Sequence, residues 1–194
     1  DAAKHQPGLV VHGAGWPLSE SKASGGSFLY HFEDRLVTLG LIADLSYTNP
    51  YLSPFDELQR YKTHPSIEQF LKGGKRIGYG ARAITKGGIN SLPKMSMPGA
   101  LLIGCDAGTL NFSKIKGTHT AMKSGMVAAE TLFDVLRNDD PGGRDLTEYH
   151  SAFQDSWAYS ELYTSRSFGP ALHRFGTYLG GAFNFVDQNW FRGR

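Results

Sequence analysis

The sequence contains only one cysteine, Cys105, among its 194 residues. A single cysteine excludes a disulfide within the chain and any four-cysteine zinc or iron–sulfur site. The seven histidines show neither HxxxH nor HExxH spacing, so they do not indicate a metal site. The dinucleotide fingerprint GxGxxG is also missing, and with it the usual pyrophosphate-binding loop. We therefore predict no metal ligands in this chain.

Long apolar runs and an excess of charge of one sign are missing as well. No run approaches the ~20 apolar residues that a membrane-spanning helix needs. The chain carries 20 basic and 18 acidic residues, a balance that does not indicate nucleic-acid binding. Residues 1–5 are not apolar, so no signal peptide is expected.

The composition is that of a folded protein, because 40% of the residues are hydrophobic and 12% are aromatic. A chain of this length can build one sizeable core, or one domain and part of another. Three apolar segments at close spacing predict strands that pair as an antiparallel sheet. Gly40 lies inside the third segment and predicts a bulge there. The predicted strands are 8–16, 27–33 and 36–45.

Two glycines, Gly25 and Gly26, precede the second predicted strand. Such a pair forms a turn by default. The functional alternative is a close approach of the backbone to a ligand, because glycine has no side chain to keep a ligand away. The local sequence leaves both interpretations open.

Short helices are predicted after this sheet. Ser53 is a suitable N-cap and Pro54 suits the first helical position, so a helix is expected to about Lys62. A further short helix is expected over 66–71, and an extended segment over 76–84.

The stretch from Ala100 to Gly125 is the one around which the chain is organised. Leu101–Ile103 predicts a buried strand, and a helix is predicted from Thr118 to about Leu136. Three interpretations compete for this stretch: tight packing of small residues, an anion site at the helix start, and a helix start that faces a flavin ring. Spacing alone does not separate the second from the third.

Cys105 is followed directly by Asp106. A thiol beside a carboxylate suggests a nucleophile, but the sequence pairs no histidine with it. A buried structural thiol is therefore the favoured interpretation.

The C-terminal part is predicted to be helical. A loop is expected over 138–143, followed by a helix over 146–163 with Phe153, Trp157 and Leu162 in the core. Apolar residues recur at steps of three and four over 168–191, which predicts a further helix. Its glycines weaken that prediction by ~1 kcal/mol each. This helix either packs on the core or lies at a membrane interface, since it is aromatic and weakly charged.

Several long motifs of the sequence together match one known family. The resemblance covers nearly the whole chain and is specific, because many motifs match in order. The matching motifs are Gly15–Leu18, Gly25–His31, Asn49–Phe55, His64–Ile67, Gly73–Ile77, Tyr79–Ala83, Ile103–Cys105 and Lys114–Gly125. Together they resemble the electron transfer flavoprotein–ubiquinone oxidoreductases.

The family has an FAD domain, a ubiquinone domain and a C-terminal [4Fe–4S] domain at a membrane surface. The resemblance implies a central fragment of such a protein, with an α+β fold in which an antiparallel sheet packs with helices. It implies a ubiquinone-binding domain over 1–98 and the second flavin-contacting segment of the FAD domain over 99–137. A helical region over 138–194 follows, with the membrane-interface helix at 168–191. The cluster ligands lie outside this chain.

The resemblance also implies site residues. Gly25 and Gly26 match the family's quinone-contacting glycine pair. Cys105 stands where more distant flavoproteins often carry aspartate, so Asp106 is the alternative ribityl partner. The cofactor-binding residues implied for FAD are Gly104, Cys105 and Asp106 near the ribityl and pyrophosphate groups, and Gly117 and Thr118 at the helix start. The membrane-interface residues implied are Phe175, Leu179, Phe183, Val186 and Trp190.

The function implied is that of a flavin and iron–sulfur oxidoreductase that passes electrons from reduced electron transfer flavoprotein to ubiquinone. The cofactors carry the redox chemistry, and no side chain of this chain is expected to act as acid or base. The expected location is monotopic, on the bacterial inner membrane or the mitochondrial inner membrane. Two alternatives are a flavin-dependent prenyl reductase and a non-catalytic membrane-surface binding module.

Overall fold

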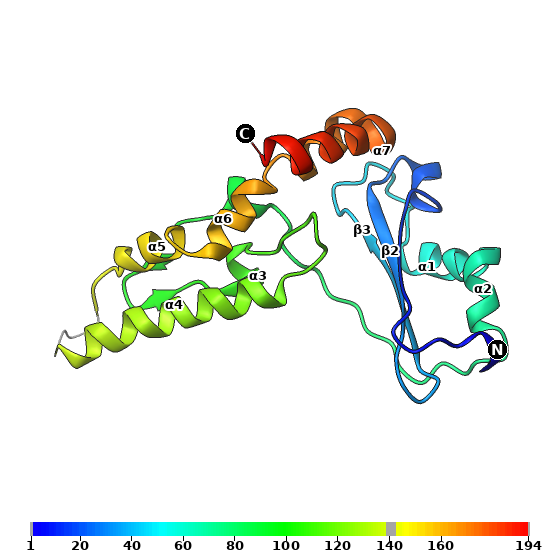
Figure 1. Cartoon of the computed structure of the whole chain (residues 1–194), viewed down its shortest axis with the longest axis horizontal. Helices are drawn as coiled ribbons and strands as arrows, with labels where there is room; N and C mark the ends of the chain where they lie inside the picture. The colour runs from blue at the N-terminus through cyan, green and yellow to red at the C-terminus, as the bar shows by residue number, and fades with distance from the viewer. Residues whose placement is uncertain (1, 139–142, 194) are drawn as a thin grey trace. The chain divides into compact units, whose positions relative to one another are not determined.

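A computed structural model describes residues 2–138 and 143–193 of the chain. The chain divides into two compact units, Asp1–Gly80 and Ala81–Arg194, and each is treated by itself below (Figure 1). The first is built on a sheet and the second on helices, so the predicted α+β class is confirmed.

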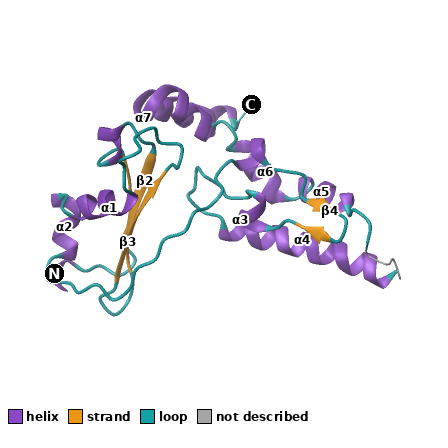
Figure 2. Cartoon of the chain, turned by 180° about the vertical axis from the view of Figure 1, so that it is seen from behind, coloured by secondary structure: helices purple, strands orange, loops and turns teal. Residues whose placement is uncertain are grey.

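The first unit contains a three-stranded antiparallel sheet in the order β1-β2-β3, as predicted. The strands are β1 (Val10–Ala14), β2 (Gly25–His31) and β3 (Val37–Ala43), seen in orange in Figure 2. A short 3-10 helix, Leu18–Ser21, lies between β1 and β2, and another, Ala2–Lys4, lies at the start of the unit.

Two predictions for this sheet are wrong. Gly25 and Gly26 do not form a turn before β2 but are its first two residues, opposite Ala43 and Ile42 of β3. Gly40 forms no bulge, because the β2–β3 pairing runs in regular register through it. A side chain at Gly40 would overlap the ring of Phe28, its partner on β2, and this explains the glycine without any bulge.

The helices α1 (Pro54–Lys62) and α2 (Pro65–Leu71) lie beside one face of the sheet (Figure 1). Ser53 caps α1 as predicted, since its hydroxyl accepts a hydrogen bond from the Asp56 backbone N–H at 3.3 Å. α2 begins one residue earlier than predicted, with His64 as its cap.

The core of the first unit lies between these helices and the sheet. This cluster consists of Leu29 from β2, Tyr61 from α1 and Ile67 from α2, and a second buried cluster of the unit consists of Leu18, Ala23 and Leu52. The extended segment expected over 76–84 joins neither sheet: the described residues 74–87 form no helix or strand, and Ile77 and Tyr79 are largely exposed.

The second unit is built on a long helix. Its elements are a 3-10 turn (Gly88–Ser91), β4 (Ser96–Met97), β5 (Ala100–Leu101), α3 (Gly104–Ala107), α4 (Thr118–Arg137), α5 (Thr147–Gln154), α6 (Trp157–Thr164), α7 (Phe168–Val186) and a π-helical turn (Asp187–Phe191). The predicted helix from Thr118 is therefore confirmed as α4. Of the loop predicted over 138–143, residues 139–142 lie outside the described residues.

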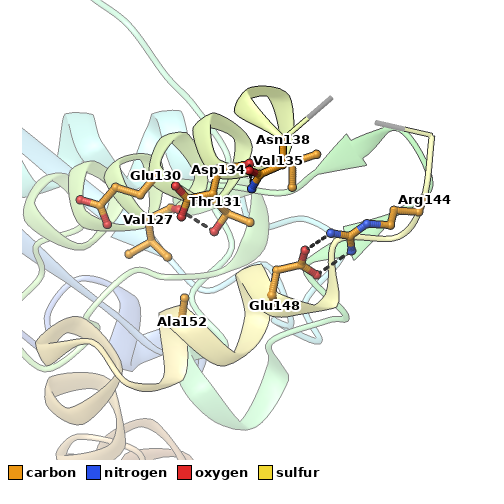
Figure 3. Close-up of a pocket in the computed structure, with 9 residues that line it drawn as sticks. All are labelled: Val127, Glu130, Thr131, Asp134, Val135, Asn138, Arg144, Glu148 and Ala152. Atoms are coloured by element: carbon orange, nitrogen blue, oxygen red, sulfur yellow. Dashed lines mark hydrogen bonds and ion pairs between the residues drawn. The ribbon is translucent and has the colours of Figure 1, made fainter. Parts of the chain in front are cut away.

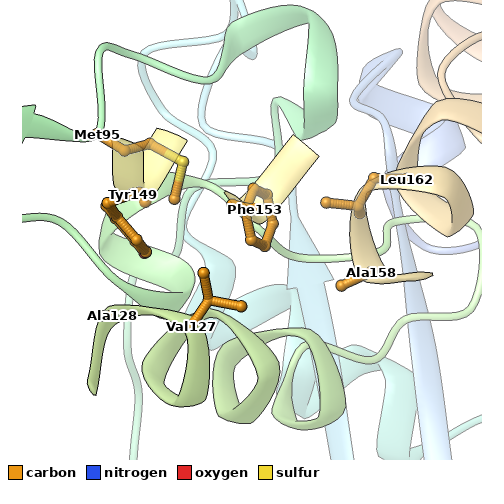
Figure 4. Close-up of a cluster of buried hydrophobic side chains, with 8 residues drawn as sticks. Met95, Val127, Ala128, Tyr149, Phe153, Ala158 and Leu162 are labelled. Carbon is orange, nitrogen blue, oxygen red and sulfur yellow. The ribbon is translucent and has the colours of Figure 1, made fainter. Parts of the chain in front are cut away.

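The core of the second unit lies where α5 and α6 pack against α4. Tyr149, Phe153 and Ala158 are completely buried, and Figure 4 shows these side chains converging with Met95 and Val127. The side chains of Leu162, Ala128 and Ala107 complete the cluster.

Two predictions for this core are wrong. The helix expected over 146–163 is interrupted at Asp155–Ser156, where the Ser156 hydroxyl donates to the Phe153 carbonyl at 2.6 Å and caps the start of α6. Trp157, expected in the core, is the first residue of this new helix and is 51% exposed.

The buried strand predicted over Leu101–Ile103 is also wrong. β5 has only two residues and pairs with the equally short β4. A two-stranded ribbon cannot cover the apolar residues that follow it, and Leu102 and Ile103 are 42% and 47% exposed.

α4 turns its small and β-branched side chains to the core and its large apolar side chains outward. Val127, Ala128 and Val135 are buried, together with the hydroxyl residues Thr120 and Ser124. The exposed apolar row consists of Met122, Met126, Leu132, Phe133 and Leu136, each at least 40% exposed.

α7 is a helical hairpin and not the single stripe that was expected. Gly176 has φ 72° and ψ −175°, which interrupts the helix, and the chain folds back on itself. Asn184 donates from Nδ2 to the carbonyl of Phe168 at 3.0 Å. A side chain at Gly180 would lie 2.8 Å from the Cα of Leu172. Within the described residues, no helix has the length and apolar character needed to cross a membrane.

Candidate functional site

The sheet of the first unit has one face covered by helices and one left open. The inward side chains of β2, such as Leu29, are buried, whereas Gly26, Phe28 and Tyr30 alternate with them and are only half-buried or exposed. The register places His12 of β1 opposite Phe28, on the same face. Gly26 therefore lies on the open face of the sheet, in line with two aromatic side chains.

The open face carries a group of interacting rings. Phe28 and Tyr30 stack with their centroids 4.9 Å apart, and Nε2 of His12 lies 2.9 Å from the Tyr30 hydroxyl. Sequence reasoning missed these three residues as neighbours of the glycine pair. The period-2 pattern of β2, read together with the register of β1, is the signal that places them there.

Gly25 and Gly26 differ in how much space the surrounding protein leaves for a side chain. A side chain at Gly25 would overlap the backbone carbonyl of Ile42 and the side chain of Leu18, so packing alone explains this glycine. At Gly26 the nearest atom would be the Gly13 carbonyl oxygen, at 3.0 Å. The packing argument is weaker at Gly26, which leaves this residue as the better candidate for a ligand contact.

In the second unit, α3 is fixed to the first turns of α4. Gly104 has φ 62°, a conformation that favours glycine, and its backbone N–H donates to the Ser124 hydroxyl at 2.8 Å. A side chain at Gly117 would lie 2.8 Å from Cδ1 of Leu110 and 3.0 Å from Sγ of Cys105. The structure thus brings three of the predicted residues, Gly104, Cys105 and Gly117, to one place.

The other two predicted residues lie at the surface beside them. Asp106 and Thr118 are exposed, and Cys105 is half-buried instead of buried as expected. α4 begins after Gly117 with no side-chain cap in the described part of the chain. Its first backbone N–H groups are therefore free to meet an acceptor, at the positive end of the helix.

A carboxylate on α6 binds the segment that leads into α4. Glu161 accepts hydrogen bonds from Nδ2 of Asn111 at 2.8 Å, from Nζ of Lys114 at 2.6 Å and from Nε2 of His119 at 2.6 Å. The His119 ring also stacks on Trp157, with centroids 5.8 Å apart. Partial burial raises the pKa of Glu161, but the three hydrogen bonds outweigh it and hold the pKa at about 2. Glu161 is therefore ionised at neutral pH.

Tyr149, on α5, links the backbone that follows β5 to the core of the second unit. Its hydroxyl donates to the Leu102 carbonyl at 3.0 Å and lies 3.4 Å from the carbonyl of Ser124. Burial raises the pKa of Tyr149 to about 12, so the hydroxyl keeps its proton at any physiological pH.

A hollow of about 490 Å³ lies elsewhere in this unit, along the second half of α4 (Figure 3). Its acidic side chains include Asp134 and Glu148, and Glu148 pairs with Arg144 at 2.5 Å. Its lining residues are all C-terminal to Met126 and include none of the predicted site residues. We therefore assign it no part in the site.

The predicted membrane-interface residues lie on the α7 hairpin and the turn after it. Phe175, Leu179, Phe183 and Trp190 are between 45% and 71% exposed, and Val186 is half-buried. The rings of Phe175 and Phe183 lie 6.3 Å apart across the hairpin.

Comparison with known proteins finds relatives of the chain. Residues 1–84 match the family model described as "ETF-QO, ubiquinone-binding". The electron transfer flavoprotein-ubiquinone oxidoreductase of Pseudomonas aeruginosa is 63% identical over the whole chain, which covers 35% of that protein. The mitochondrial protein of the same name from Bos taurus is 50% identical over the whole chain, which covers 32% of it. Over its whole length the chain is therefore similar to electron transfer flavoprotein-ubiquinone oxidoreductases.

The chain spans about one third of the length of these relatives. The open sheet face with Gly26, and its neighbour Gly25, fall inside the matched ubiquinone-binding region. Residues 104–118 fall outside that region but inside the aligned part of both relatives.

Proposed function

We propose that this chain forms part of an enzyme that passes electrons from reduced electron transfer flavoprotein to ubiquinone. The observation that carries the proposal is the 63% identity over all 194 residues to a protein whose name states both the donor flavoprotein and ubiquinone. The Asp1–Gly80 unit is the larger part of the ubiquinone-binding region, and we assign quinone binding to 1–98.

The open sheet face is the proposed place for the quinone ring. Gly26 allows a flat ring to approach the backbone, and the adjacent Phe28 ring offers an apolar surface for stacking. Gly25 continues the same strand but is held by internal packing. Substrate binding is therefore expected to depend more on Gly26 than on Gly25.

Residues 99–137 are proposed to form one side of an FAD site, and the local geometry fits this cofactor. The uncapped start of α4 offers backbone N–H groups to an anionic or electron-rich part of the flavin. Gly117 allows this start to pack closely against Leu110 and Cys105. Gly104, Cys105 and Asp106 lie on the short helix α3, which Ser124 holds against α4. When bound, FAD supplies the redox chemistry, while these residues bind and orient it.

A [4Fe–4S] cluster does not fit the residues of this chain. Four cysteine thiolates normally hold such a cluster, and the sequence contains one. Within the described residues, no three His, Cys, Asp or Glu side chains gather into a group that could hold a metal ion. We therefore place the cluster ligands of the family in sequence beyond this chain.

Residues 138–194 are proposed to form a helical region that meets a membrane surface at 168–191. The exposed aromatic and aliphatic side chains of the α7 hairpin support this, because burying such side chains in the interfacial layer of a membrane is energetically favourable. This observation also favours the second candidate function, a non-catalytic membrane-surface module.

Quinone binding tests the proposal directly. Titration of the chain with a short-chain ubiquinone is expected to quench intrinsic fluorescence to saturation, and Gly26→Val is expected to weaken binding at least tenfold. Gly78→Val is the matched control, because a side chain at Gly78 meets open space. Equal binding by the wild type and Gly26→Val would remove the open face as the quinone site.

Activity separates the two enzyme candidates. A full-length protein that contains this chain is expected to reduce ubiquinone with reduced electron transfer flavoprotein as donor. No turnover with that donor, together with reduction of a prenyl substrate, would favour the flavin-dependent prenyl reductase. The 194-residue chain by itself is expected to show little activity and weak FAD retention, and a stable yellow complex would contradict that expectation.

Vesicle flotation tests the membrane assignment. The double variant Phe183→Glu, Trp190→Glu is expected to lose binding to phospholipid vesicles. The control is Phe133→Glu, Leu136→Glu, because these side chains are equally apolar and exposed but lie on α4. Unchanged flotation of the Phe183→Glu, Trp190→Glu variant would contradict the assignment of 168–191 to a membrane interface.

A further inference from the structure

Glu161 is a single carboxylate that joins α6 to a segment far from it in the sequence. Its donors lie 42 to 50 residues earlier in the chain, on the loop 111–116 and on the first turn of α4. The side chain is only 21% exposed, although it is charged. Removing a carboxylate from water to this extent costs desolvation free energy, and the three hydrogen bonds of Glu161 offset that cost.

The donors of Glu161 surround the start of α4 in sequence. Asn111 also holds the loop itself, since its Oδ1 accepts from the Ser113 hydroxyl at 2.8 Å and its backbone pairs with Lys116. His119 follows Gly117 and Thr118 directly. The carboxylate therefore fixes both ends of the short segment that carries these two residues.

Glu161 also sets the local charge. Lys114 is a cation whose ammonium lies 2.6 Å from the carboxylate, and His119 adds a second positive charge whenever it is protonated. The α4 start contributes further positive potential. Without Glu161, a group bound at this helix start would experience a considerably more positive field.

We propose that Glu161 is a positioning residue that holds the α4 start in its ligand-ready conformation and balances the charge there. The proposal rests on the proposed function, since it takes the group at the α4 start to be FAD. It assigns a role to Glu161, Lys114 and Asn111 beyond the residues implied by the family resemblance. Glu161 itself touches neither cofactor nor substrate in this role.

The positioning part is tested on the 194-residue chain by backbone amide exchange. Glu161→Gln keeps the shape of the side chain but removes its charge. Exchange of the hydrogen-bonded amides within 111–120, those of Asn111, Lys114, Ile115 and Lys116, is expected to rise about tenfold or more. Exchange in β2 and in the Phe153 core is expected to stay unchanged. The matched control is Glu148→Gln, which removes the carboxylate of the exposed pair with Arg144 on α5.

Two outcomes of the exchange experiment would overturn the positioning role. Unchanged exchange at 111–120 would show that the hydrogen bonds of Glu161 do not hold the segment. A uniform rise throughout the unit would show general destabilisation. If Glu161→Gln does not fold, Lys114→Met replaces it, because Lys114 is 54% exposed and its loss leaves Asn111 and His119 on Glu161.

The charge part is tested by the midpoint potential of FAD in the full-length protein. Glu161→Gln is expected to make the potential more positive, because removing a negative charge stabilises the reduced, more negative flavin. Lys114→Met is expected to make it more negative, and Lys94→Met, which removes a lysine paired with Asp145, is expected to leave it unchanged. Shifts of the same sign in Glu161→Gln and Lys114→Met would overturn the charge role.

The two proposals fail in distinguishable ways. If the wild-type full-length protein binds no FAD, the proposed function is wrong, whereas amide exchange at 111–120 still decides the positioning role. If FAD binds normally and both potentials stay at the wild-type value, the flavin assignment survives and the charge role does not.

Discussion

The two units of the chain each bury one side of their main element and leave the other side exposed, but they bury different chemistry. The sheet of the first unit buries Leu29 and leaves Phe28 and Tyr30 on its open face. In the second unit, α4 buries Val127 with Thr120 and Ser124 and leaves its larger apolar side chains outside.

The difference lies in how the buried polar groups are satisfied. The three buried hydroxyls of α4 donate to carbonyls of their own helix or its N-cap, Thr120 to Gly117 at 3.0 Å, Ser124 to Ala121 at 2.8 Å and Thr131 to Val127 at 2.9 Å. Burying them therefore leaves no donor unpaired. His31, buried in the first unit, has Nε2 without a hydrogen-bond partner among the described residues. The described part of the second unit also holds buried side-chain atoms without a hydrogen-bond partner, among them the hydroxyls of Ser96 and Thr109, so the contrast is between α4 and His31 and not between the two units as wholes.

The largest expected effect contrasts the buried and exposed faces of the second unit. Phe153→Ala removes a completely buried ring from the centre of the core, and we expect a loss of about 3–5 kcal/mol in the free energy of unfolding. Phe133→Ala removes a ring that is 62% exposed on α4 and is expected to cost less than about 1 kcal/mol. Denaturant unfolding measures both, and equal losses would show that the outer face of α4 is covered in solution.

The second prediction concerns acid. The pKa of Glu161 is about 2 in the folded chain against 4.5 for the free side chain. Because the folded-state pKa is lowered, the stabilisation is complete above pH 4.5 and is lost as the pH falls towards 2. The loss is on the order of 3 kcal/mol at most. Glu161→Gln is expected to remove this acid dependence of the second unit, and an unchanged acid profile in the variant would contradict the assignment.

The third prediction returns to the sheet. Gly25→Ala forces a methyl group onto the Ile42 carbonyl, a backbone group that cannot move without distorting β3. We expect a loss of about 2–3 kcal/mol in the free energy of unfolding of the first unit. Gly78→Ala, at a site where a side chain meets open space, is the control for the loss of glycine itself. A neutral Gly25→Ala would show that β2 and β3 can separate at this end.

Much of the fold could be predicted because its signals are local. The N-cap Ser53 and the first-turn Pro54 define the start of α1 within a few residues of sequence. Three apolar segments at close spacing, the second of them rich in aromatic residues, likewise predicted the three strands of the sheet.

The faces of α4 could not be predicted in the same way. Periodicity shows that a helix has a large apolar row, but it does not show whether that row meets the core. Here the hydroxyls of Thr120 and Ser124 donate to carbonyls of the same helix. The face that carries them can therefore be buried, while the large apolar row stays outside. The hairpin of α7 had a local signal in Gly176, but the positive φ that makes the turn is visible only in the structure.

Sequence reasoning predicted only those residues of the candidate site that belong to continuous sequence motifs. Gly104, Cys105 and Gly117 belong to motifs quoted from the sequence, and the structure brings them together. Glu161 was missed, because its partners lie at least 42 residues away and nothing near it in sequence distinguishes it from a surface glutamate.

The smallest expected effect concerns the buried His31 side chain of the first unit. Burial lowers the pKa of His31 from its usual 6.5, and the neighbouring His5 ring, 5.0 Å away, lowers it further. The Gln6 backbone N–H donates to Nδ1 at 3.0 Å, which favours the neutral ring. Because the folded-state pKa is lowered, the first unit is fully stabilised above pH 6.5 and loses stability as the pH falls below it.

Acidification is therefore expected to loosen the first unit before the second, since Glu161 begins to be protonated only below pH 4.5. Amide exchange of β2 peptides, compared with peptides of the Phe153 core between pH 7 and 5 and corrected for intrinsic rates, measures the difference. His31→Asn keeps an acceptor for the Gln6 N–H but does not titrate, so it should abolish the early loosening, and His5→Ala should reduce it. Simultaneous loosening of both units in the wild type would mean that they unfold as one, and the contrast drawn between them would then fail.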